Sequence, residues 1–416
     1  MGAISDIATS ELQPTPPGSS RLGATWADAG GEERELLVAF PRIPIELIAR
    51  DAYIDRIRVI LTAMVIFHHS AVTYGASGGW FYREFPVSSE LSSLLLTFFC
   101  ATNQAFFMGF FFLLAGYYTP RSLDKKGYAC YLADRFLRLG LPLLAFGFVL
   151  SPITIWLVER RKGVSFGNVA QYLWRHRQFE NGPLWFAQAL IIFALLYACW
   201  HWLRGGVQTS VPKPVPSNRA WLVSALLIGA AALAIRQFVP VGVNVIGLQV
   251  GYFASYIFLF GVGIAAARNG WLDSLKLAQA RRWMMITALT IPLLPAMIVA
   301  ARVYHLNYGN FVGGFSLTSV MYALWEPFVA FGIIAGMLVW FRENGNRPSP
   351  ARSWFARRAY TVFIIHPPVL VTISMLLLPW HGPALAKFAA AGSLAVVASW
   401  MLAGPLVLVP GVRRIV

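Results

Sequence analysis

The sequence predicts an all-α fold, a polytopic integral-membrane bundle of about ten transmembrane helices with both termini cytoplasmic. The chain is 57% hydrophobic and only 12% charged, whereas soluble domains contain about 25% charged residues. Long apolar runs recur from residue 57 to the C-terminus. The net charge of +16 comes from basic residues in short loops between these runs, which indicates membrane topology and argues against nucleic acid as a partner.

Residues 1–50 form the first predicted region, a disordered polar cytoplasmic tail. They are rich in Pro, Gly, Ser and Glu, as in ELQPTPPGSS and GGEERE, and such segments bury too little apolar surface to fold. A short surface helix is expected near residues 43–50. The start MGAISDIATS shows no cleavable signal peptide. Residues 51–416 form the second region, the transmembrane domain.

Ten apolar segments make up this domain, each near or above the roughly 17 to 25 residues that cross a bilayer. The eighth is long and contains Glu326-Pro327, which favours tilt or a kink. The fifth and sixth leave little room between them. The segments are 57–75, 92–118, 137–158, 183–203, 220–237, 244–267, 283–302, 313–341, 359–379 and 387–410.

The basic residues predict the orientation of these segments. With a cytoplasmic N-terminus, 25 of the 34 Lys and Arg residues lie on the cytoplasmic side. One loop is an exception, because residues 159–182 carry five basic residues on the predicted outer face. Either this loop serves an acidic acceptor, or the segment count is off by one helix before it. The first interpretation is favoured, since an offset would disturb every later loop.

The most informative spacing lies in the first segment, RVILTAMVIFHH, where His69 follows Arg58 by eleven residues. Eleven helical steps return to within roughly 20° of the starting direction and rise about 16 Å. Arg58 and His69 therefore share a helix face, whereas His68 points about 80° away. An ionisable side chain at membrane depth marks a candidate functional site. The alternative is that Arg58 is a positive-inside anchor and His69 a hydrogen-bonded packing residue.

Two other ionisable residues lie at membrane depth. Glu326, in MYALWEPFVAF, needs an Arg, His or hydroxyl partner or must be protonated, and it fits a substrate-binding or a structural role. His366, in RRAYTVFIIHPPVL, precedes Pro367 and Pro368, which interrupt a helix and free backbone carbonyls. Either the kink alone matters there, or His366 contacts substrate.

A basic cluster occupies the first predicted cytoplasmic loop: Arg121, Lys125, Lys126, Arg135 and Arg138. Arg135 and Arg138 are three residues apart and should share a helix face. The cluster fits positive-inside charge that attracts anionic lipid, at about 1 kcal/mol per basic residue. It also fits a cradle for a phosphate-bearing donor such as coenzyme A.

Several other chemistries lack their signals. The three cysteines, Cys100, Cys130 and Cys199, form no CxxC pair, so neither a disulfide framework nor a metal site is expected. The sequence contains no GxSxG, GxxxxGK[ST] or HExxH motif and no HxxxxD after any histidine. Serine hydrolase, nucleotide-driven pump and zinc protease functions therefore lose support.

Four stretches in order resemble the acyltransferase 3 family of bacterial membrane proteins, and within it most closely the glucans biosynthesis protein C type. They are YIDRIRVILTAMVIFHHS, MGFFFLLAGYYTPRSLDKKGYACYLADRFLRLGLPLL, GPLWFAQALIIFALLY and RRAYTVFIIHPPVLV. Ala115 stands where the family usually has Ser, and Phe363 where Tyr is common. The resemblance spans about residues 50 to 410.

This resemblance implies an enzyme, an O-acyltransferase of the bacterial inner membrane. The acyl group, succinyl or acetyl among those expected, moves from cytoplasmic acyl-CoA to a hydroxyl of a cell-envelope carbohydrate or glucan. His69 then acts as general base, and Arg58 orients the donor. Trp185 walls the cavity together with the substrate-binding candidates Glu326 and His366. The donor phosphates bind to Arg135, Arg138, Lys125 and Lys126.

The partners expected are acyl-CoA as a donor substrate, the carbohydrate acceptor and the lipid bilayer, with no permanently bound cofactor or metal. The sequence does not indicate an oligomeric state. A second hypothesis is a proton-coupled transporter or flippase of a lipid-linked sugar, in which His69 and Glu326 relay protons without acyl chemistry. Matched broken helices in inverted repeats would favour that alternative.

Overall fold

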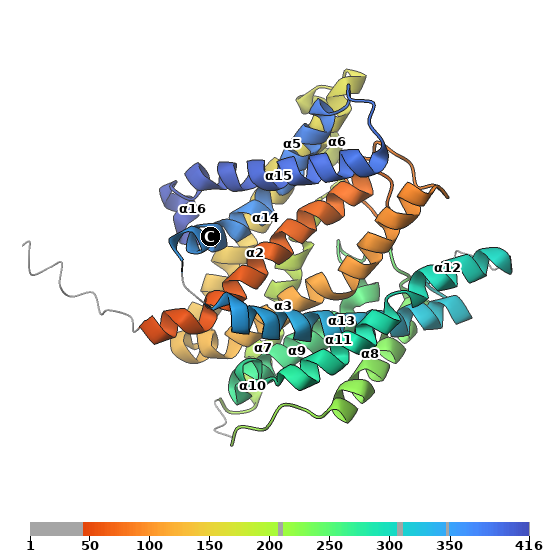
Figure 1. Cartoon of the computed structure of the whole chain (residues 1–416). Helices are drawn as coiled ribbons and strands as arrows, with labels where there is room; N and C mark the ends of the chain where they lie inside the picture. The colour runs from red at the N-terminus through yellow and green to blue at the C-terminus, as the bar shows by residue number, and fades with distance from the viewer. Residues whose placement is uncertain (1–44, 207–210, 306–310, 347–348, 416) are drawn as a thin grey trace, which may run out of the picture. The chain divides into compact units, whose positions relative to one another are not determined.

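The computed structural model describes residues 45–206, 211–305, 311–346 and 349–415 (Figure 1). Within these ranges the chain is helical, with one isolated bridge between Val245 and Leu248 and no strand. The all-α prediction is confirmed. Residues 1–44 of the predicted tail lie outside the described residues, and residues 45–50 already belong to helix α2 (Ile45–Thr73). The predicted surface helix is therefore continuous with the first apolar segment.

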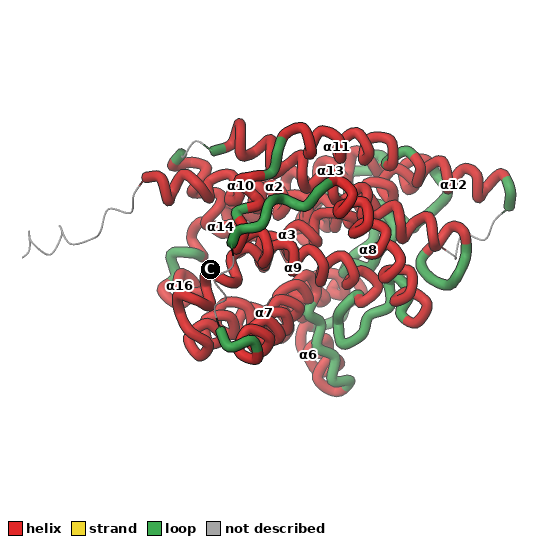
Figure 2. The backbone as a smooth tube through the Cα atoms, turned by 90° about the horizontal axis from the view of Figure 1, so that it is seen from below, coloured by secondary structure: helices red, strands yellow, loops and turns green. Residues whose placement is uncertain are grey.

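The helices that follow α2 cover the predicted apolar segments (Figure 2). Those in the segments are α3 (Leu91–Arg135), α5 (Ser151–Glu159), α7 (Trp185–Leu203), α8 (Asn218–Phe238), α9 (Phe253–Asn269), α11 (Leu277–Thr290), α12 (Leu293–Val303), α13 (Leu317–Gly345), α14 (Pro350–Leu376) and α15 (Ala384–Leu406). The remaining helices are α4 (Leu141–Ala145), α6 (Phe166–Arg175), α10 (Trp271–Ser274) and α16 (Pro410–Ile415), with π-helical turns η1 (Phe136–Gly140) and η2 (Phe146–Leu150) and 3-10 turns η3 (Arg160–Lys162), η4 (Gly182–Leu184) and η5 (Val250–Tyr252).

Eight helical runs in the described chain are long and apolar enough to cross a membrane. One of them, the 72-residue run Leu91–Lys162, contains both the second and the third predicted segments. The helix α2 is not among the eight, because charged residues such as Arg56 and Arg58 lie along it. The protein is thus a multi-pass membrane protein, while the count of ten crossings stays a prediction.

The loops of the bundle gather at two ends, named here by the residues that begin and end α2. At the Thr73 end, Phe81 lies against Phe146 with 6.4 Å between ring centroids, and Asn181 Nδ2 donates to the Gly247 carbonyl at 3.2 Å. Burial and the Glu84 carboxylate raise the pKa of Tyr82, and the nearby Arg161 guanidinium opposes this rise. Loops 74–90 and 159–182 therefore share one end, which contradicts the alternative of a missing helix between them.

At the Ile45 end, Arg56 Nη1 donates to the Asn344 carbonyl at 3.5 Å, and Tyr360 Oη donates to the Arg138 carbonyl at 2.9 Å. The C-terminal helix α16 packs against η1 at this same end (Figure 1). Helix α16 and the start of α2 thus lie at the same end of the bundle. Which side of the membrane this is stays a prediction.

Glycines allow the closest helix crossings, as is usual in membrane bundles. A Cβ atom on Gly116 of α3 would lie 2.2 Å from the Phe260 carbonyl oxygen of α9, and one on Gly263 would lie 2.1 Å from that of Leu113. Gly332 lets α13 approach the Trp283 carbonyl of α11 in the same way. These contacts bring α3 close to α9 and α11 close to α13.

Three predicted segments differ from the structure for local reasons. The predicted loop 119–138 is helical except at Gly127, whose φ of 72° and ψ of 169° break α3. The predicted segment 283–302 is split between α11 and α12 around Pro292, which lacks a backbone N–H. The predicted segment 244–267 becomes α-helical only at Phe253. By contrast, α13 and α14 stay continuous through their internal prolines.

Candidate active site

His69 lies one turn before the end of α2, where the chain enters loop 74–90. Its backbone carbonyl accepts a hydrogen bond from Thr73 Oγ1 at 3.0 Å, while Thr62 Oγ1 donates to the Arg58 carbonyl at 2.8 Å. The hydroxyl groups of both threonines on α2 therefore donate to backbone carbonyls of the same helix. The His69 Nδ1 atom is enclosed without a hydrogen-bond partner, and the residue as a whole is half-buried.

The rings of His69, Trp80 and His366 lie together and are nearly parallel, with 5.9 Å between the Trp80 and His366 centroids. The Trp80 ring stacks on His69 with 3.7 Å between centroids and 14° between planes, and His366 follows at 5.5 Å and 17°. The planes of Trp80 and His366 differ by only 9°. His69 therefore belongs to a cluster of three nearly parallel rings from α2, loop 74–90 and α14, called the histidine cluster below.

Loop 74–90 is held over His69 by polar contacts at its own turns. Arg83 donates to the carbonyls of Ala76 and Gly78, at 2.7 Å each. Glu84 forms an ion pair with Lys387 of α15, which is 2% exposed. Sequence reasoning missed Trp80, and the only signal for it is the aromatic stretch WFYREF directly after the first apolar segment.

His366 owes its orientation to the proline that follows it. Pro367 has no N–H, so the Phe363 carbonyl four residues earlier lacks its usual helical donor. The His366 Nδ1 atom lies 2.8 Å from that carbonyl oxygen. Because a carbonyl only accepts, Nδ1 carries the proton and Nε2 is left as a bare acceptor, buried and without a partner. The two prolines do not interrupt α14, contrary to the prediction, but they do free a backbone carbonyl.

His68 has different surroundings from its neighbour, as the helix spacing predicts. Its ring stacks on Phe107 of α3 at 5.1 Å and 22°, and it stands 85° from the plane of the His69 ring. Cys100 Sγ donates to the His68 carbonyl at 3.6 Å. His68 is therefore packed against α3, whereas His69 faces loop 74–90 and α14.

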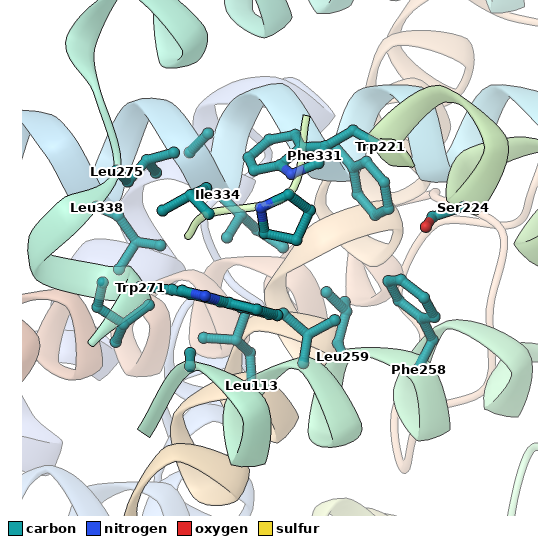
Figure 3. A pocket seen from close by; sticks show the side chains of 16 residues that line it. Leu113, Trp221, Ser224, Phe258, Leu259, Trp271, Leu275, Phe331, Ile334 and Leu338 are labelled. Carbon is teal, nitrogen blue, oxygen red and sulfur yellow. The ribbon is translucent and has the colours of Figure 1, made fainter. Parts of the chain in front are cut away.

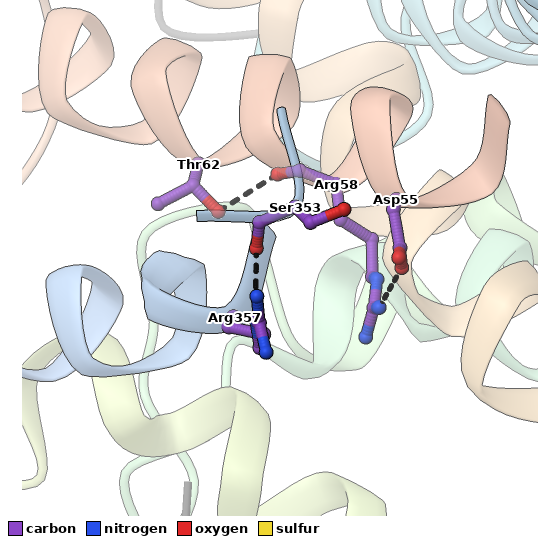
Figure 4. Close-up of polar contacts among 5 residues, drawn as sticks. All are labelled: Asp55, Arg58, Thr62, Ser353 and Arg357. Carbon is purple, nitrogen blue, oxygen red and sulfur yellow. Dashed lines mark hydrogen bonds and ion pairs between the residues drawn. The ribbon is translucent and has the colours of Figure 1, made fainter. Parts of the chain in front are cut away.

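Arg58 does not meet His69, because about 16 Å of helix separate them. Its guanidinium forms an ion pair with Asp55 one turn earlier, and its side chain is 44% exposed. Figure 4 shows this pair at the Ile45 end, the same end that carries Ser353 and Arg357 of α14. The structure thus places the two predicted catalytic residues at separate levels of one helix.

The predicted phosphate-binding residues lie at the Ile45 end around an acidic residue. Asp134 accepts from Arg138 Nε at 3.0 Å and pairs with Lys126 Nζ at 2.9 Å. Arg135 instead lies over the Tyr131 ring, 5.1 Å from its centroid. Lys125 is exposed. Arg135 and Arg138 thus take different partners, and Asp134 offsets part of the positive charge.

The Trp185 side chain lies in an aromatic wall next to the histidine cluster. It stacks on Tyr256 at 5.7 Å and 25°, and it lies 6.3 Å from Phe186. Phe186 is 6.1 Å from Phe363, which is 5.9 Å from His366. This chain of ring contacts connects Trp185 to His366 across α7 and α14.

Glu326 forms a separate buried site with a partner that sequence reasoning missed. Arg236 Nη2 of α8 donates to Glu326 Oε2 at 2.5 Å, and the two side chains are 1% and 5% exposed. Arg236 Nε donates to the Gly251 carbonyl at 3.0 Å, and the guanidinium lies 5.3 Å from the ring centroids of Tyr252 and Tyr322. The expected need for an Arg, His or hydroxyl partner is thus met by Arg236, which lies in the fifth predicted segment.

Within the described ranges, no group of three or more His, Cys, Asp or Glu residues lies close enough together to hold a metal ion. The cysteines Cys100, Cys130 and Cys199 are all free thiols.

Comparison with known proteins gives one match. A family model described as an acyltransferase domain matches residues 51–404, most of the chain. No curated protein and no solved structure matches the chain. The four stretches of the predicted resemblance all lie inside the matched range, so the family is confirmed, while the closeness to the glucans biosynthesis protein C type stays a prediction. This multi-pass membrane protein belongs to the acyltransferase 3 family.

Proposed function

We propose that this acyltransferase moves an acyl group from acyl-CoA to a hydroxyl group of a cell-envelope carbohydrate in the bacterial inner membrane. The observation that carries the proposal is the separation of two sites along α2. His69 lies in the histidine cluster at the Thr73 end, and the basic residues gather at the Ile45 end. A donor with phosphates at one end and a thioester at the other fits such a separation.

His69 serves as the general base in this proposal. It removes the proton from an acceptor hydroxyl as the oxygen attacks the thioester carbonyl carbon. The tetrahedral intermediate then collapses, the carbon–sulfur bond breaks, and the departing thiolate takes the proton from His69. A positioned general base is typically worth about 10² to 10⁴ in rate.

The aromatic walls support a carbohydrate as the acceptor. Trp80 and Trp185 are half-buried, and flat indole rings offer large apolar faces next to a polar N–H group. His366 Nε2 is a bare acceptor, which suits a sugar hydroxyl donor. From the family resemblance we further propose that the acceptor is a glucan and that the acyl group is succinyl or acetyl.

The donor phosphates bind at the Ile45 end in this proposal, to Arg135, Arg138, Lys125 and Lys126, with Arg58 nearer the thioester. Guanidinium groups match phosphate oxygens in pairs. With the positive-inside bias of the loops, this end faces the cytoplasm, where acyl-CoA is available. Membership of an acyltransferase family favours this function over the transporter alternative.

The proposal is tested by the acyl content of cell-envelope carbohydrates, measured by mass spectrometry. Cells lacking the gene should lose an acyl ester that the intact gene restores. A set of radiolabelled acyl-CoA esters, offered to the purified protein in vesicles, then identifies the acyl group. Identical ester content with and without the gene, together with no transfer from any acyl-CoA, would overturn it.

A further inference from the structure

An apolar cavity lies between α3, α8, α9, α10 and α13, away from the histidine cluster. Its volume is about 110 Å³. Figure 3 shows the rings of Trp221, Phe258 and Trp271 around the space, with the Ser224 hydroxyl at its edge. No residue proposed above to act in acyl transfer lines this cavity.

The lining favours hydrocarbon over water. A buried water needs two to four polar partners, and empty apolar cavities of about 150 Å³ stay dry and accept small hydrocarbons. Apart from the Ser224 hydroxyl, the side chains here are aliphatic or aromatic. The helices α3, α8, α9 and α13 around the cavity are also apolar enough to cross a membrane.

The rim of the cavity is fixed by hydrogen bonds. Trp271 Nε1 donates to the Lys213 carbonyl at 2.8 Å, and the Lys213 N–H donates to Asn269 Oδ1 at 2.8 Å. Arg342 donates to the carbonyls of Leu272 and Leu275, at 2.8 and 2.7 Å. These bonds hold the chain around Lys213 and residues 269–275 in place beside the cavity at the Ile45 end.

This rim carries Lys213, Lys276 and Arg342 against one acidic residue, Asp273, so its net charge is positive. Lys213 lies two residues before the lining residue Val215, and Lys276 directly follows the lining residue Leu275. Both lysine side chains are exposed. A basic residue near the membrane surface attracts anionic lipid by about 1 kcal/mol, or about fivefold in occupancy.

We propose that this cavity binds the end of one acyl tail of an anionic phospholipid, whose headgroup phosphate lies near Lys213 and Lys276. Hydrocarbon fills the apolar space, and the lysines select the headgroup charge. The bound tail wedges between α8 and α13, so the site anchors the lipid as a structural ligand and takes no part in acyl transfer.

The test uses the full-length protein in vesicles that contain phosphatidylglycerol with a diazirine at the end of one tail. After irradiation, mass spectrometry should locate crosslinks at Phe258 and Leu338. Substitution Ala335→Trp fills the cavity and should lower this yield by about tenfold, equivalent to about 1.4 kcal/mol. The control Leu227→Trp, on the exposed face of α8, should leave it unchanged.

Further measurements keep the test decisive if Ala335→Trp does not fold. Ser224→Phe narrows the cavity from its edge and should also lower the yield. Replacing Lys213 and Lys276 with Glu should remove the preference for phosphatidylglycerol over phosphatidylcholine probes. The proposal would be overturned if the cavity residues stayed unlabelled, or if the filled variants were labelled as strongly as the original protein. Displacement of the label by acyl-CoA would also overturn it, because the cavity would then belong to the donor.

Discussion

Pro367 controls the orientation of His366 through a missing hydrogen bond. Any residue other than proline at position 367 could donate its backbone N–H to the Phe363 carbonyl. His366 Nδ1 replaces that donor at 2.8 Å. The proline thus sets which imidazole nitrogen faces the site. The sequence pattern His-Pro-Pro predicted a freed carbonyl but could not indicate that the adjacent histidine would occupy it.

The substitution Pro367→Ala restores the backbone donor and should release His366. A net hydrogen bond is worth about 0.5–1.5 kcal/mol, so kcat should fall by about 2- to 13-fold with normal protein levels. The matched control is Pro405→Ala, since Pro405 also lies inside a helix but is exposed. Steady-state kinetics in vesicles measure both variants, and an unchanged kcat for Pro367→Ala would refute this role.

His69 was predictable because helix geometry relates residues eleven apart without any tertiary information. Trp80 was not predictable in this way. Its position on the His69 ring depends on the local Arg83 contacts. It also depends on the Glu84–Lys387 ion pair, whose residues are 303 positions apart in the chain. Such contacts leave no periodic pattern in the sequence.

The α8–α13 contact depends on the buried pair of Arg236 and Glu326. Removing one member of a buried ion pair leaves a charge without its partner and typically costs about 3–5 kcal/mol. Glu326→Ala should therefore lower the unfolding temperature of the purified protein strongly. Glu343→Ala, an exposed acidic residue on the same helix, should not.

A double variant separates structure from substrate binding at this pair. Arg236→Met with Glu326→Leu removes both charges and should recover most of the thermal stability. If Glu326 binds substrate, this stable double variant would still lack transfer activity. Glu326→Ala with an unchanged unfolding temperature would contradict the structural role.

The proposed donor site lies at the α3–η1 junction, and Asp134 should weaken phosphate binding there. Arg138→Ala should weaken acyl-CoA binding, more at low salt than at high salt, because screening reduces charge attraction. Asp134→Asn should strengthen binding, because it frees Lys126 and Arg138 from the carboxylate. Equilibrium binding of a labelled acyl-CoA at two salt levels measures both, with Arg175→Ala on α6 as the control. Equal affinities in all variants would leave these residues as positive-inside charges.

Apolar length predicted the helices well, since crossing a bilayer imposes about 20 residues. Their ends were less predictable, because local chemistry sets them. Gly127 breaks α3 through a positive φ, and Pro292 separates α11 from α12. Conversely, the π-helical turns η1 and η2 keep the third segment helical around Pro142.

The arrangement of loops at two ends supports the predicted alternation, and labelling determines its direction. In a background without native cysteines, single cysteines at Lys126 and Lys276 should resist a membrane-impermeant thiol reagent applied from outside. Cysteines at Gly79 and Asn168 should react. Outside labelling at Lys126 would reverse the orientation, and protection at Asn168 would refute an external basic loop at 159–182.

His69 is the proposed catalytic base, and its neighbour His68 provides the control. His68 and His69 are imidazoles at almost the same depth, but only His69 faces Trp80 and His366. A general effect of burial would treat both alike. A base requires one specific face of the helix.

The deciding measurement is therefore acyl transfer by His69→Ala and His68→Ala, each at matched protein levels in the membrane. His69→Ala should lose about 10² to 10⁴ in rate, whereas His68→Ala should retain most of its activity. Substantial transfer by His69→Ala, or the same loss in both variants, would contradict the assignment.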